Sequence, residues 1–435
     1  MQPLSPLDGR YAKAVHSLRP FFTEDALIRA RLYIEVQYLI ALSDERGIPE
    51  CKIPAAAQAG LLKLVHNFSG KDADRIRLIE KKTNHDVKAV EYYLREQWKK
   101  IAGAKARTEF VHFALTSEDV NNLAYGVLMH DAIKSVLRPE LQGLISTLRT
   151  LATKNSNKRM LSLTHGQPAT PTTLGKEIMV FVDRLIRQYE ELTRFRMQGK
   201  FGGAVANFSA HKAAYPDFQW ERFGAKFVRS LKLDPIKYAT QINPHDDMAE
   251  VSHIYCRINT ILLDFSRDVW MYVSRGIFKQ RTVAGEVGSS TMPHKVNPID
   301  FENAEGNLGL SSALFSHFAE KLPISRLQRD LSDSTVQRSI GVAFGYHVLA
   351  ISALRKGLKK LAVNSEQLID ELHAHPEVMT EAIQTVMRKH GYDDAYERMK
   401  ALSRGKRVTW EALKEFVSGL EISKADKERL VKMLK

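Results

Sequence analysis

The spacing of apolar residues in the middle of the chain most limits what it can fold into. One stripe steps by four and three residues, the spacing of one helix face, and consists of Leu137, Leu141, Leu144, Leu148 and Leu151. Similar stripes occupy residues 174–192, 251–272 and 344–361, and no proline lies between Pro244 and Pro293. Alternation typical of strands is scarce. Because helices this long are unusual outside bundles, the pattern predicts an all-α fold with a central bundle of long helices.

The chain of 435 residues divides into three predicted parts. At roughly 150 residues per domain, its length allows about three domains. We expect an N-terminal helical domain with shorter helices over residues 1–105 and a central long-helix bundle domain over residues 106–358. A short, charged helical domain is expected at the C-terminus, over residues 359–435.

Composition excludes several classes of protein. The cysteines, Cys51 and Cys256, lie far apart, so they provide neither a disulfide framework nor zinc-ligand spacing, and they fit a reducing compartment such as the cytoplasm. We expect no signal peptide, and no stretch approaches the roughly 18 apolar residues of a membrane span. The net charge of +14 attracts nucleic acids, acidic membranes or small multi-anionic substrates. Because the basic residues are scattered, composition does not choose among these partners.

The sequence GSSTMPHKVNP at residues 288–298 breaks the helical pattern and predicts a flexible loop. Its serine hydroxyls and backbone N–H groups, together with Lys295 and Asn297, suit a site that holds a carboxylate and the charge that develops on it. An ordinary linker between two helices is the alternative, and composition alone favours the linker.

Two further polar segments contain histidines. Residues 164–173 place His165 in a loop between two long helices, where a histidine can act as an acid or a base near neutral pH. Residues 83–88 place His85 at a predicted helix start. A single histidine is more often structural or solvated, so neither one indicates a site by itself.

Two short segments offer groups that suit anions. Thr116 and Asp119 have the spacing of a capping box, which predicts a helix start whose free N–H groups favour an anion. A plain helix start is the alternative. Residues 8–11 read DGRY, a turn-like segment with Arg10 available to an anion.

The segment RLQRDLSDSTVQR at residues 326–338 also suits an anion. Ser334 and Gln337 have capping-box spacing, which predicts a helix start at Ser334 with Arg338 in the first turn and Arg329 just upstream. The N-terminal end of a helix favours negative charge, so an arginine there is unfavourable by itself. A phosphate bound between the two arginines would explain their position. A solvated run of charges explains the segment equally well.

Taken together, these segments resemble the fumarase/aspartase superfamily of lyases. The loop at residues 288–298 contains the full pattern Gly-Ser-Ser-x-Met-Pro-x-Lys-x-Asn-Pro of that superfamily. His294 before the lysine is similar to the adenylosuccinate lyases, in their bacterial subgroup, whereas fumarases tend to have Gly there and argininosuccinate lyases Gln. Residues 83–86, 116–119 and 164–171 match in the same order. Two departures are that the subgroup usually continues past Lys435 and that Ala206 stands where relatives often have glycine.

The resemblance implies a β-elimination in which a base removes a proton beside a carboxylate of a succinyl group. The carbanion spreads its charge onto that carboxylate, and fumarate leaves as an acid protonates the departing nitrogen. By resemblance Ser289 is the base and His165 the acid. Lys295 and loop N–H groups would stabilise the deprotonated serine and the intermediate. The implied substrates are adenylosuccinate, which gives AMP, and SAICAR, which gives AICAR.

The same resemblance assigns residues that bind the substrate. Those expected at the succinyl group are Thr116, Ser117, Lys295 and Asn297. Those expected at the nucleotide phosphate are Arg10, Tyr11, Arg329, Ser334 and Arg338. Further substrate contacts are expected from Asn84, His85, Asp86, His112, Gln241, Ser290 and Thr335. Among these, His85 is the rival candidate for the acid.

Assembly and partners are implied in the same way. The family is homotetrameric, with a multi-helix core built from the long helices of all four chains and active sites that draw residues from three subunits. The expected ligands are small-molecule nucleotides. No metal or organic cofactor is required, and neither nucleic acid nor a membrane is an expected partner.

Three alternatives remain open on the sequence. The nearest is another lyase of the superfamily, such as an argininosuccinate lyase or a cycloisomerase. The charge of +14 suggests a basic helical protein that binds nucleic acid, although no recognition-helix motif supports it. The third is a structural protein that kept the fold and lost its activity, against which Ser289, His165 and Lys295 argue.

Overall fold

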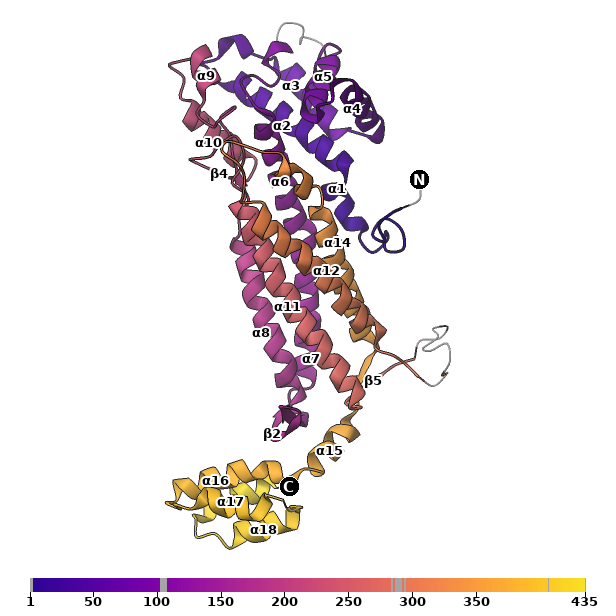
Figure 1. The fold of residues 1–435 in the computed structure, drawn as a ribbon, viewed down its shortest axis with the longest axis vertical. Helices are drawn as coiled ribbons and strands as arrows, with labels where there is room; N and C mark the ends of the chain where they lie inside the picture. Colours follow the sequence, from indigo (N-terminus) through magenta and orange to yellow (C-terminus); the bar gives the residue numbers. More distant parts are fainter. Residues whose placement is uncertain are drawn as a thin grey trace. The chain divides into compact units, whose positions relative to one another are not determined.

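The computed structural model describes residues 3–101, 108–282, 285, 292, 295–405 and 407–434. Its regular structure is almost entirely helical (Figure 1), so the predicted all-α class is confirmed. The chain forms two compact units. The first contains residues 1–144, 185–264 and 302–354, and the second contains residues 145–184, 265–301 and 355–435. The division into three domains stays a prediction.

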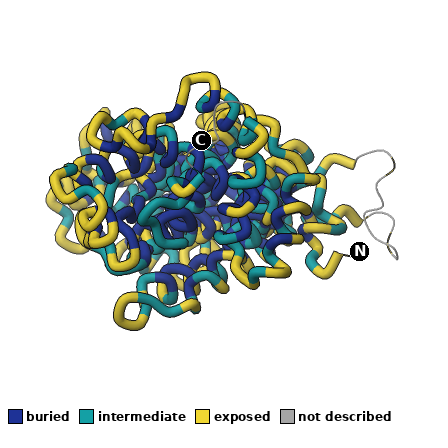
Figure 2. The backbone as a smooth tube through the Cα atoms, turned by 90° about the horizontal axis from the view of Figure 1, so that it is seen from above, coloured by how far each residue is buried: buried dark blue, intermediate teal, exposed yellow. Residues whose placement is uncertain are grey.

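Five long helices contribute residues to both units. They are α7 (Arg138–Lys154), α8 (Leu174–Arg194), α11 (Asp246–Ser274), α12 (Ile299–Lys321) and α14 (Ile340–Lys360). The apolar stripes predicted α7, α8, α11 and α14, and Leu141, Leu144 and Leu148 of the first stripe are buried. Buried and exposed stretches alternate along the helices (Figure 2), as expected where one face of a helix packs against neighbours.

The first unit also contains the shorter helices that position the candidate site. In its N-terminal segment these are η1 (His16–Leu18), α1 (Arg19–Phe22), α2 (Glu24–Asp44), η2 (Pro49–Cys51), α3 (Ala55–His66), α4 (Gly70–Thr83), α5 (Asp86–Trp98), η3 (Thr108–Phe110), α6 (Ser117–Ala132) and η4 (Ile133–Leu137). Its later segments add α9 (Ser209–Ala214), α10 (Trp220–Ser230) and α13 (Ser332–Gln337). The short strands β3 (Gln198–Gly199) and β4 (Asp234–Pro235) pair in parallel.

The expectation of shorter helices near the N-terminus is wrong for α2, whose 21 residues equal the length of α8. Its buried residues follow one another almost without a break and include the charged Arg31 and Glu35. A helix buried on several sides, with charged groups among its buried residues, shows no single apolar stripe in its sequence.

The second unit contains the C-terminal helices and most of the strands. The helices are α15 (Ser365–His373), η5 (Pro376–Met379), α16 (Thr380–Lys389), α17 (Ala395–Ser403), α18 (Trp410–Ser418) and α19 (Lys424–Met433). Their core includes Ile383, Met387, Leu413 and Val417. Strand β5 (Phe278–Gln280) pairs antiparallel with β6 (Leu361–Val363).

A β-hairpin occupies the segment expected to be a loop around His165. Strand β1 (Arg159–Thr164) pairs antiparallel with β2 (Gln167–Thr173), and Thr164 lies opposite Gln167. Pro168 and Pro171 argue against a strand, because proline cannot donate a backbone hydrogen bond. In a two-stranded ribbon each strand keeps one unpaired edge, where proline is tolerated.

Candidate active site

A cavity of about 430 Å³ lies in the first unit, at the end of α4 and the starts of α5 and α6. The predicted substrate-binding residues that line it are Asn84, His85, Asp86, Ser117, Arg329, Ser334, Thr335 and Arg338. Its other lining residues are Arg31, Glu80, Glu118, Asn121, Tyr125, Leu331 and Gln337. Candidate residues from three separate segments of the sequence are therefore brought together around one cavity.

Two helix starts meet at this cavity. Asn84 ends α4 in the left-handed conformation, with φ of 49°, and His85 is the N-cap of α5. His85 Nδ1 accepts a hydrogen bond from the N–H of Lys88 at 3.1 Å, and its Nε2 lies 3.3 Å from Ser117 Oγ at the start of α6. Since Nδ1 accepts, Nε2 is the ring nitrogen that carries a proton and can donate it to Ser117 Oγ. The predicted helix start at His85 is confirmed, and the two helix N-termini together favour an anion.

A buried carboxylate holds the start of α6 in place. The N–H of Thr116 donates to Asp119 Oδ2 at 2.9 Å, so the predicted capping box is confirmed. Asp119 also accepts hydrogen bonds from the N–H groups of Gly202 and Gly203, at 3.1 and 2.9 Å. Its Oδ1 lies 2.9 Å from Lys200 Nζ. The first turn of α6 is thereby tied to the segment at residues 200–203.

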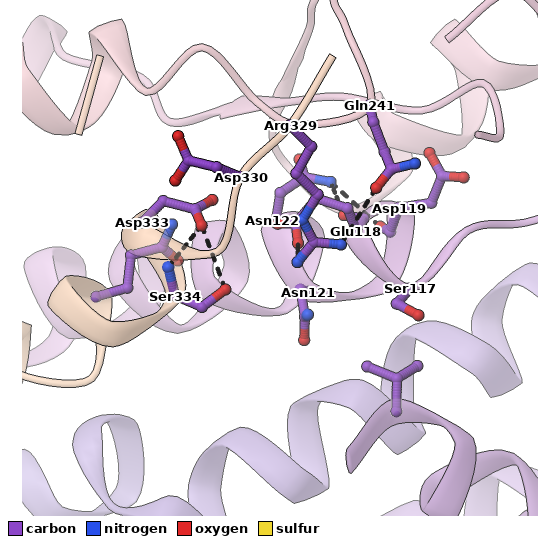
Figure 3. Close-up of polar contacts among 12 residues, drawn as sticks. Ser117, Glu118, Asp119, Asn121, Asn122, Gln241, Arg329, Asp330, Asp333 and Ser334 are labelled. Atoms are coloured by element: carbon purple, nitrogen blue, oxygen red, sulfur yellow. Dashed lines mark hydrogen bonds and ion pairs between the residues drawn. The ribbon is translucent and has the colours of Figure 1, made fainter. Parts of the chain in front are cut away.

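Arg329 contacts the cavity wall through two partners (Figure 3). Its guanidinium lies 3.2 Å from Glu118 Oε2 and donates a hydrogen bond to Gln241 Oε1 at 3.3 Å. Burial raises the pKa of Glu118 above its ordinary value, although the positive charge of Arg329 opposes the rise. Arg329 Nε is buried and has no hydrogen-bond partner among the described residues. The guanidinium therefore keeps a donor for a further acceptor.

A second cluster of charges surrounds Asp86. Its Oδ2 lies 2.6 Å from the buried guanidinium of Arg31 and 3.5 Å from that of Arg338. Burial alone would raise the pKa of Asp86, but the positive charge of Arg31, a backbone hydrogen bond and Arg338 hold it below its ordinary value. Arg31 also donates to Asn121 Oδ1 at 2.7 Å. Asp86 is therefore an ionised carboxylate that orients both arginines.

The predicted helix start at Ser334 is wrong. Helix α13 begins at Ser332, where Asp330 Oδ1 accepts the N–H of Ser332 at 2.8 Å, and Ser334 lies within the helix. Arg338 is the C-cap, the end of a helix that favours a positive charge, so the argument that its position opposes the dipole fails. The capping-box spacing of Ser334 and Gln337 was misleading because two aspartates accept the backbone N–H groups at this point. Asp330 accepts that of Ser332. Asp333 accepts that of Ser334 (Figure 3). Arg338 still lines the cavity, with its side chain half exposed.

Several predicted substrate-binding residues of the first unit do not line the cavity. Arg10 lies over the ring of Tyr11 at 5.8 Å, in the turn predicted for residues 8–11. His112 Nδ1 lies 2.6 Å from Glu35 Oε1 in an acidic setting. Gln241 donates to the carbonyl oxygen of Ala204 and contacts the site through Arg329. Thr116 does not line the cavity either, but as the N-cap of α6 it holds the helix start that carries Ser117.

The predicted acid lies at the tip of the hairpin in the second unit. His165 and Gly166 have φ of 54° and 72° and form a two-residue turn with both φ values positive, the turn that suits the twist of a hairpin. The side chain of His165 is exposed. A residue other than glycine in this conformation is uncommon and is often found at functional sites.

The predicted catalytic loop is described only in part. Lys295 is exposed and its N–H donates to the carbonyl oxygen of Met292 at 3.0 Å. Asn297 is partly buried. The predicted base Ser289 and the predicted contact Ser290 lie outside the described residues.

Sequence reasoning did not assign six lining residues with polar side chains to the site: Arg31, Glu80, Glu118, Asn121, Tyr125 and Gln337. Arg31 and Asn121 are buried polar residues within helices, where periodicity gives no sign of them. Glu118 could have been found, because it directly follows Ser117 in the predicted capping box. Tyr125 lies two helical turns further along, and burial raises the pKa of its phenol.

Two further classes of feature are absent from the part of the chain that the structure describes. No helix there is both long enough and apolar enough to cross a membrane. In the same residues, no group of three or more His, Cys, Asp or Glu side chains is arranged to hold a metal ion.

Comparison with known proteins gives the class of this chain. The sequence model of the Lyase family matches residues 9–310, and that of the adenylosuccinate lyase C-terminal region matches residues 325–435. The structure is similar to a fumarate lyase from Mesorhizobium sp. BNC1, with a TM-score of 0.74 at 18% identity over 96% of this chain and 93% of that one, a likeness that shows the fold. The chain is thus a lyase of the fumarase/aspartase superfamily.

Sequence relatives narrow this class. The adenylosuccinate lyase of Legionella pneumophila (strain Corby) is 50% identical over 436 residues, which covers 100% of this chain and 95% of the relative. That of Escherichia coli (strain K12) is 49% identical over 431 residues, which covers 99% and 94%. The chain belongs to the adenylosuccinate lyase family, and the resemblance inferred from the loop at residues 288–298 is confirmed.

Proposed function

We propose that this chain eliminates fumarate from adenylosuccinate, giving AMP, and from SAICAR, giving AICAR, in purine nucleotide synthesis. The observation that carries the proposal is the cavity that joins the starts of α5 and α6 to Arg329 and Arg338. Each substrate carries two carboxylates and a phosphate. A site for these substrates needs two separate regions that favour negative charge. Helix N-termini and arginine side chains are the groups that usually bind carboxylates and phosphates.

The proposed roles divide the substrate between these two places. Ser117 and the N-terminus of α6, with Thr116 behind them, bind a carboxylate of the succinyl group. Arg329 and Arg338, with Ser334 between them in sequence, bind the phosphate. Asn84, Asp86 and Thr335 complete the wall, and Asp86 holds Arg338 in place. Four predicted substrate contacts do not line the cavity, and we propose them as contacts at its outer edge: Arg10, Tyr11, His112 and Gln241.

The chemistry is a β-elimination. Ser289 removes the proton from the carbon beside a carboxylate, and Lys295, Asn297 and Ser290 stabilise the carboxylate as it takes up the charge of the carbanion. The carbon–nitrogen bond then breaks as the leaving nitrogen receives a proton. No metal or organic cofactor takes part in these steps.

His165 is a better candidate than His85 for the acid. His85 Nδ1 accepts a backbone hydrogen bond and its Nε2 faces Ser117 Oγ at 3.3 Å, so both ring nitrogens already have partners at the two helix starts. The ring of His165 is exposed on a hairpin turn, where a substrate can reach it. We assign proton donation to His165 and substrate orientation to His85.

We further propose a homotetramer in the cytoplasm, with active sites shared between subunits. His165 and Lys295 belong to the second unit, whereas the cavity is built from the first unit. Large apolar side chains are exposed on α8, α11 and α12, among them Met179, Trp270 and Leu310 at 38, 42 and 52%. Such surfaces usually mark protein interfaces. Light scattering that gives a stable, active monomer would contradict this assembly.

Activity is tested by fumarate release from purified protein. The absorbance of adenylosuccinate and of SAICAR should change as each is converted, while argininosuccinate should stay intact. Turnover of argininosuccinate without turnover of either nucleotide would overturn the proposal and favour the neighbouring branch of the superfamily.

A further inference from the structure

A second cavity in the first unit, of about 510 Å³, lies where α6 passes through η4 into α7. It shares no lining residue with the candidate active site. Its basic lining residues are His130, Lys134, Arg138, Arg196, Arg229 and Lys232. Among its lining residues, all within the described part of the chain, Asp234 is the one acidic side chain. The cavity therefore has a strong excess of positive charge.

Two nitrogen atoms of this cavity are buried without a partner. His130 Nε2 and Arg138 Nε have no hydrogen-bond partner among the described residues. The guanidinium of Arg138 lies over the ring of Tyr189, 5.5 Å from its centre, which limits its movement. The Nε–H group of Arg138 is a donor in every protonation state of the site, and a buried donor normally has an acceptor, since leaving it unpaired is unfavourable. A bound anion would supply one.

Three of the basic groups act on His130. Burial lowers the pKa of His130, Asp131 opposes this change, and the positive charges of Lys232, Lys134 and Arg196 lower the pKa further. The basic groups thus act together on one point of the cavity. Arg196 also donates to the carbonyl oxygens of Thr193 and Phe195, at 2.9 and 2.8 Å, so part of its guanidinium is already used.

The backbone at this cavity departs from regular helix. Residues Ile133–Leu137 form a π-helical turn. Pro139 has no N–H to donate to the carbonyl group of Ser135, which weakens the regular pattern at this point. Wide turns of this kind are rare and are frequently found at functional sites. Here Lys134 lies within the turn and Arg138 directly follows it, and both line the cavity.

Apart from Thr193, the remaining wall is apolar. It consists of Ile133, Leu192, Phe195, Met197 and Leu233. We propose that this cavity is a second ligand site, which binds a small molecule that joins two or more adjacent anionic groups to an apolar or aromatic body, as in a nucleoside diphosphate. The basic groups and the unpaired nitrogens bind the anionic head, and the apolar wall packs against the body.

Calorimetric titration of the full-length protein with ADP and with pyrophosphate tests this site. All titrations use the Arg329→Ala/Arg338→Ala background, which weakens phosphate binding at the candidate active site. Adding Lys134→Gln/Lys232→Gln removes two exposed charges from the second cavity. Lys63→Gln/Lys154→Gln removes two exposed charges elsewhere and is the matched control. Arg138→Met is a third variant, which removes the charge of this partly buried side chain and keeps an unbranched apolar stem, and thermal unfolding confirms that each variant folds.

The expected result is that Lys134→Gln/Lys232→Gln weakens ADP binding roughly tenfold or more, as does Arg138→Met, while the control pair changes it little. ADP should also bind more tightly than pyrophosphate, because only ADP has a body for the apolar wall. The site is overturned if the Lys134 and Lys232 substitutions leave the affinity unchanged, or if the control pair lowers it equally. Equal affinity for the two probes would overturn the role of the apolar wall.

Discussion

Lys200 Nζ lies 2.9 Å from Asp119 Oδ1 in the interior of the first unit, and both side chains are almost fully buried. Lys200 also donates to the carbonyl oxygen of Gly203 at 2.7 Å. Because Asp119 caps α6, this ion pair links the core of the unit to the helix start where Ser117 lines the cavity.

Removal of one partner of this pair should strongly destabilise the protein. Lys200→Met leaves a buried carboxylate without its counter-ion, and breaking such pairs costs about 3–5 kcal/mol. Urea unfolding measures the loss. Lys226→Met, which breaks an exposed pair with Glu45, is the matched control and should change stability little. Equal stability of the two variants would show that the buried pair does not hold the helix start.

Stability should depend on pH through His112. Burial lowers the pKa of His112, but Glu35 and Glu91 outweigh it and raise the pKa above its ordinary value. A raised pKa stabilises the fold below the unfolded pKa of about 6.5, and this contribution is lost as pH rises through the folded pKa. The free energy of unfolding of wild type should therefore exceed that of His112→Gln most at low pH, with the difference shrinking as pH rises. A constant difference would contradict the ion pair, and His66→Gln, at an exposed site, serves as control.

Nucleotide binding should depend on Arg329 and Arg338. Arg329→Ala and Arg338→Ala each remove a charge-assisted contact to phosphate, worth about 1.5–3 kcal/mol. Both should weaken inhibition by AMP and leave fumarate binding nearly unchanged. Arg326→Ala, in the same segment with its side chain 83% exposed, should bind AMP normally. Normal AMP binding by all three variants would remove the phosphate assignment.

Ala206→Gly should stabilise the protein slightly. Ala206 has φ of 56°, a conformation that costs a residue with a Cβ roughly 1–2 kcal/mol. Glycine removes that strain but adds about 0.5–1 kcal/mol of unfolded-state entropy, so a gain of about 1 kcal/mol or less is expected in thermal unfolding. Ala204→Gly, two residues earlier at an exposed position without positive φ, should destabilise instead. A loss of stability in Ala206→Gly would show that the strain is relieved elsewhere.

Local sequence signals predicted the parts of the fold that depend on neighbouring residues. Apolar spacing predicted α7, α8, α11 and α14, and the pair Thr116 and Asp119 predicted a capped helix start. The pair Ser334 and Gln337 failed, because capping-box spacing does not show which of several polar residues begins the helix. Here Asp330 bonds to the N–H of Ser332 instead.

Other features depend on contacts between distant segments. Arg31 lines the cavity because Asp86 and Asn121 pair with it across 55 and 90 residues of sequence, which no periodicity shows. The hairpin at His165 was missed because its prolines resemble those of a loop. The function was predicted from the family resemblance of residues 288–298. The composition of that segment alone favoured an ordinary linker between two helices.

The proposed reaction depends on removal of a proton by Ser289 from a substrate bound at this cavity. Its most direct test is the rate of fumarate release from adenylosuccinate by Ser289→Ala, compared with Ser290→Ala in the same assay. Loss of a general base lowers the rate by about 10²–10⁴-fold, and AMP should still bind, because Arg329, Arg338 and Ser117 are unchanged. Near-normal turnover by Ser289→Ala, with the larger loss in Ser290→Ala, would contradict the claim.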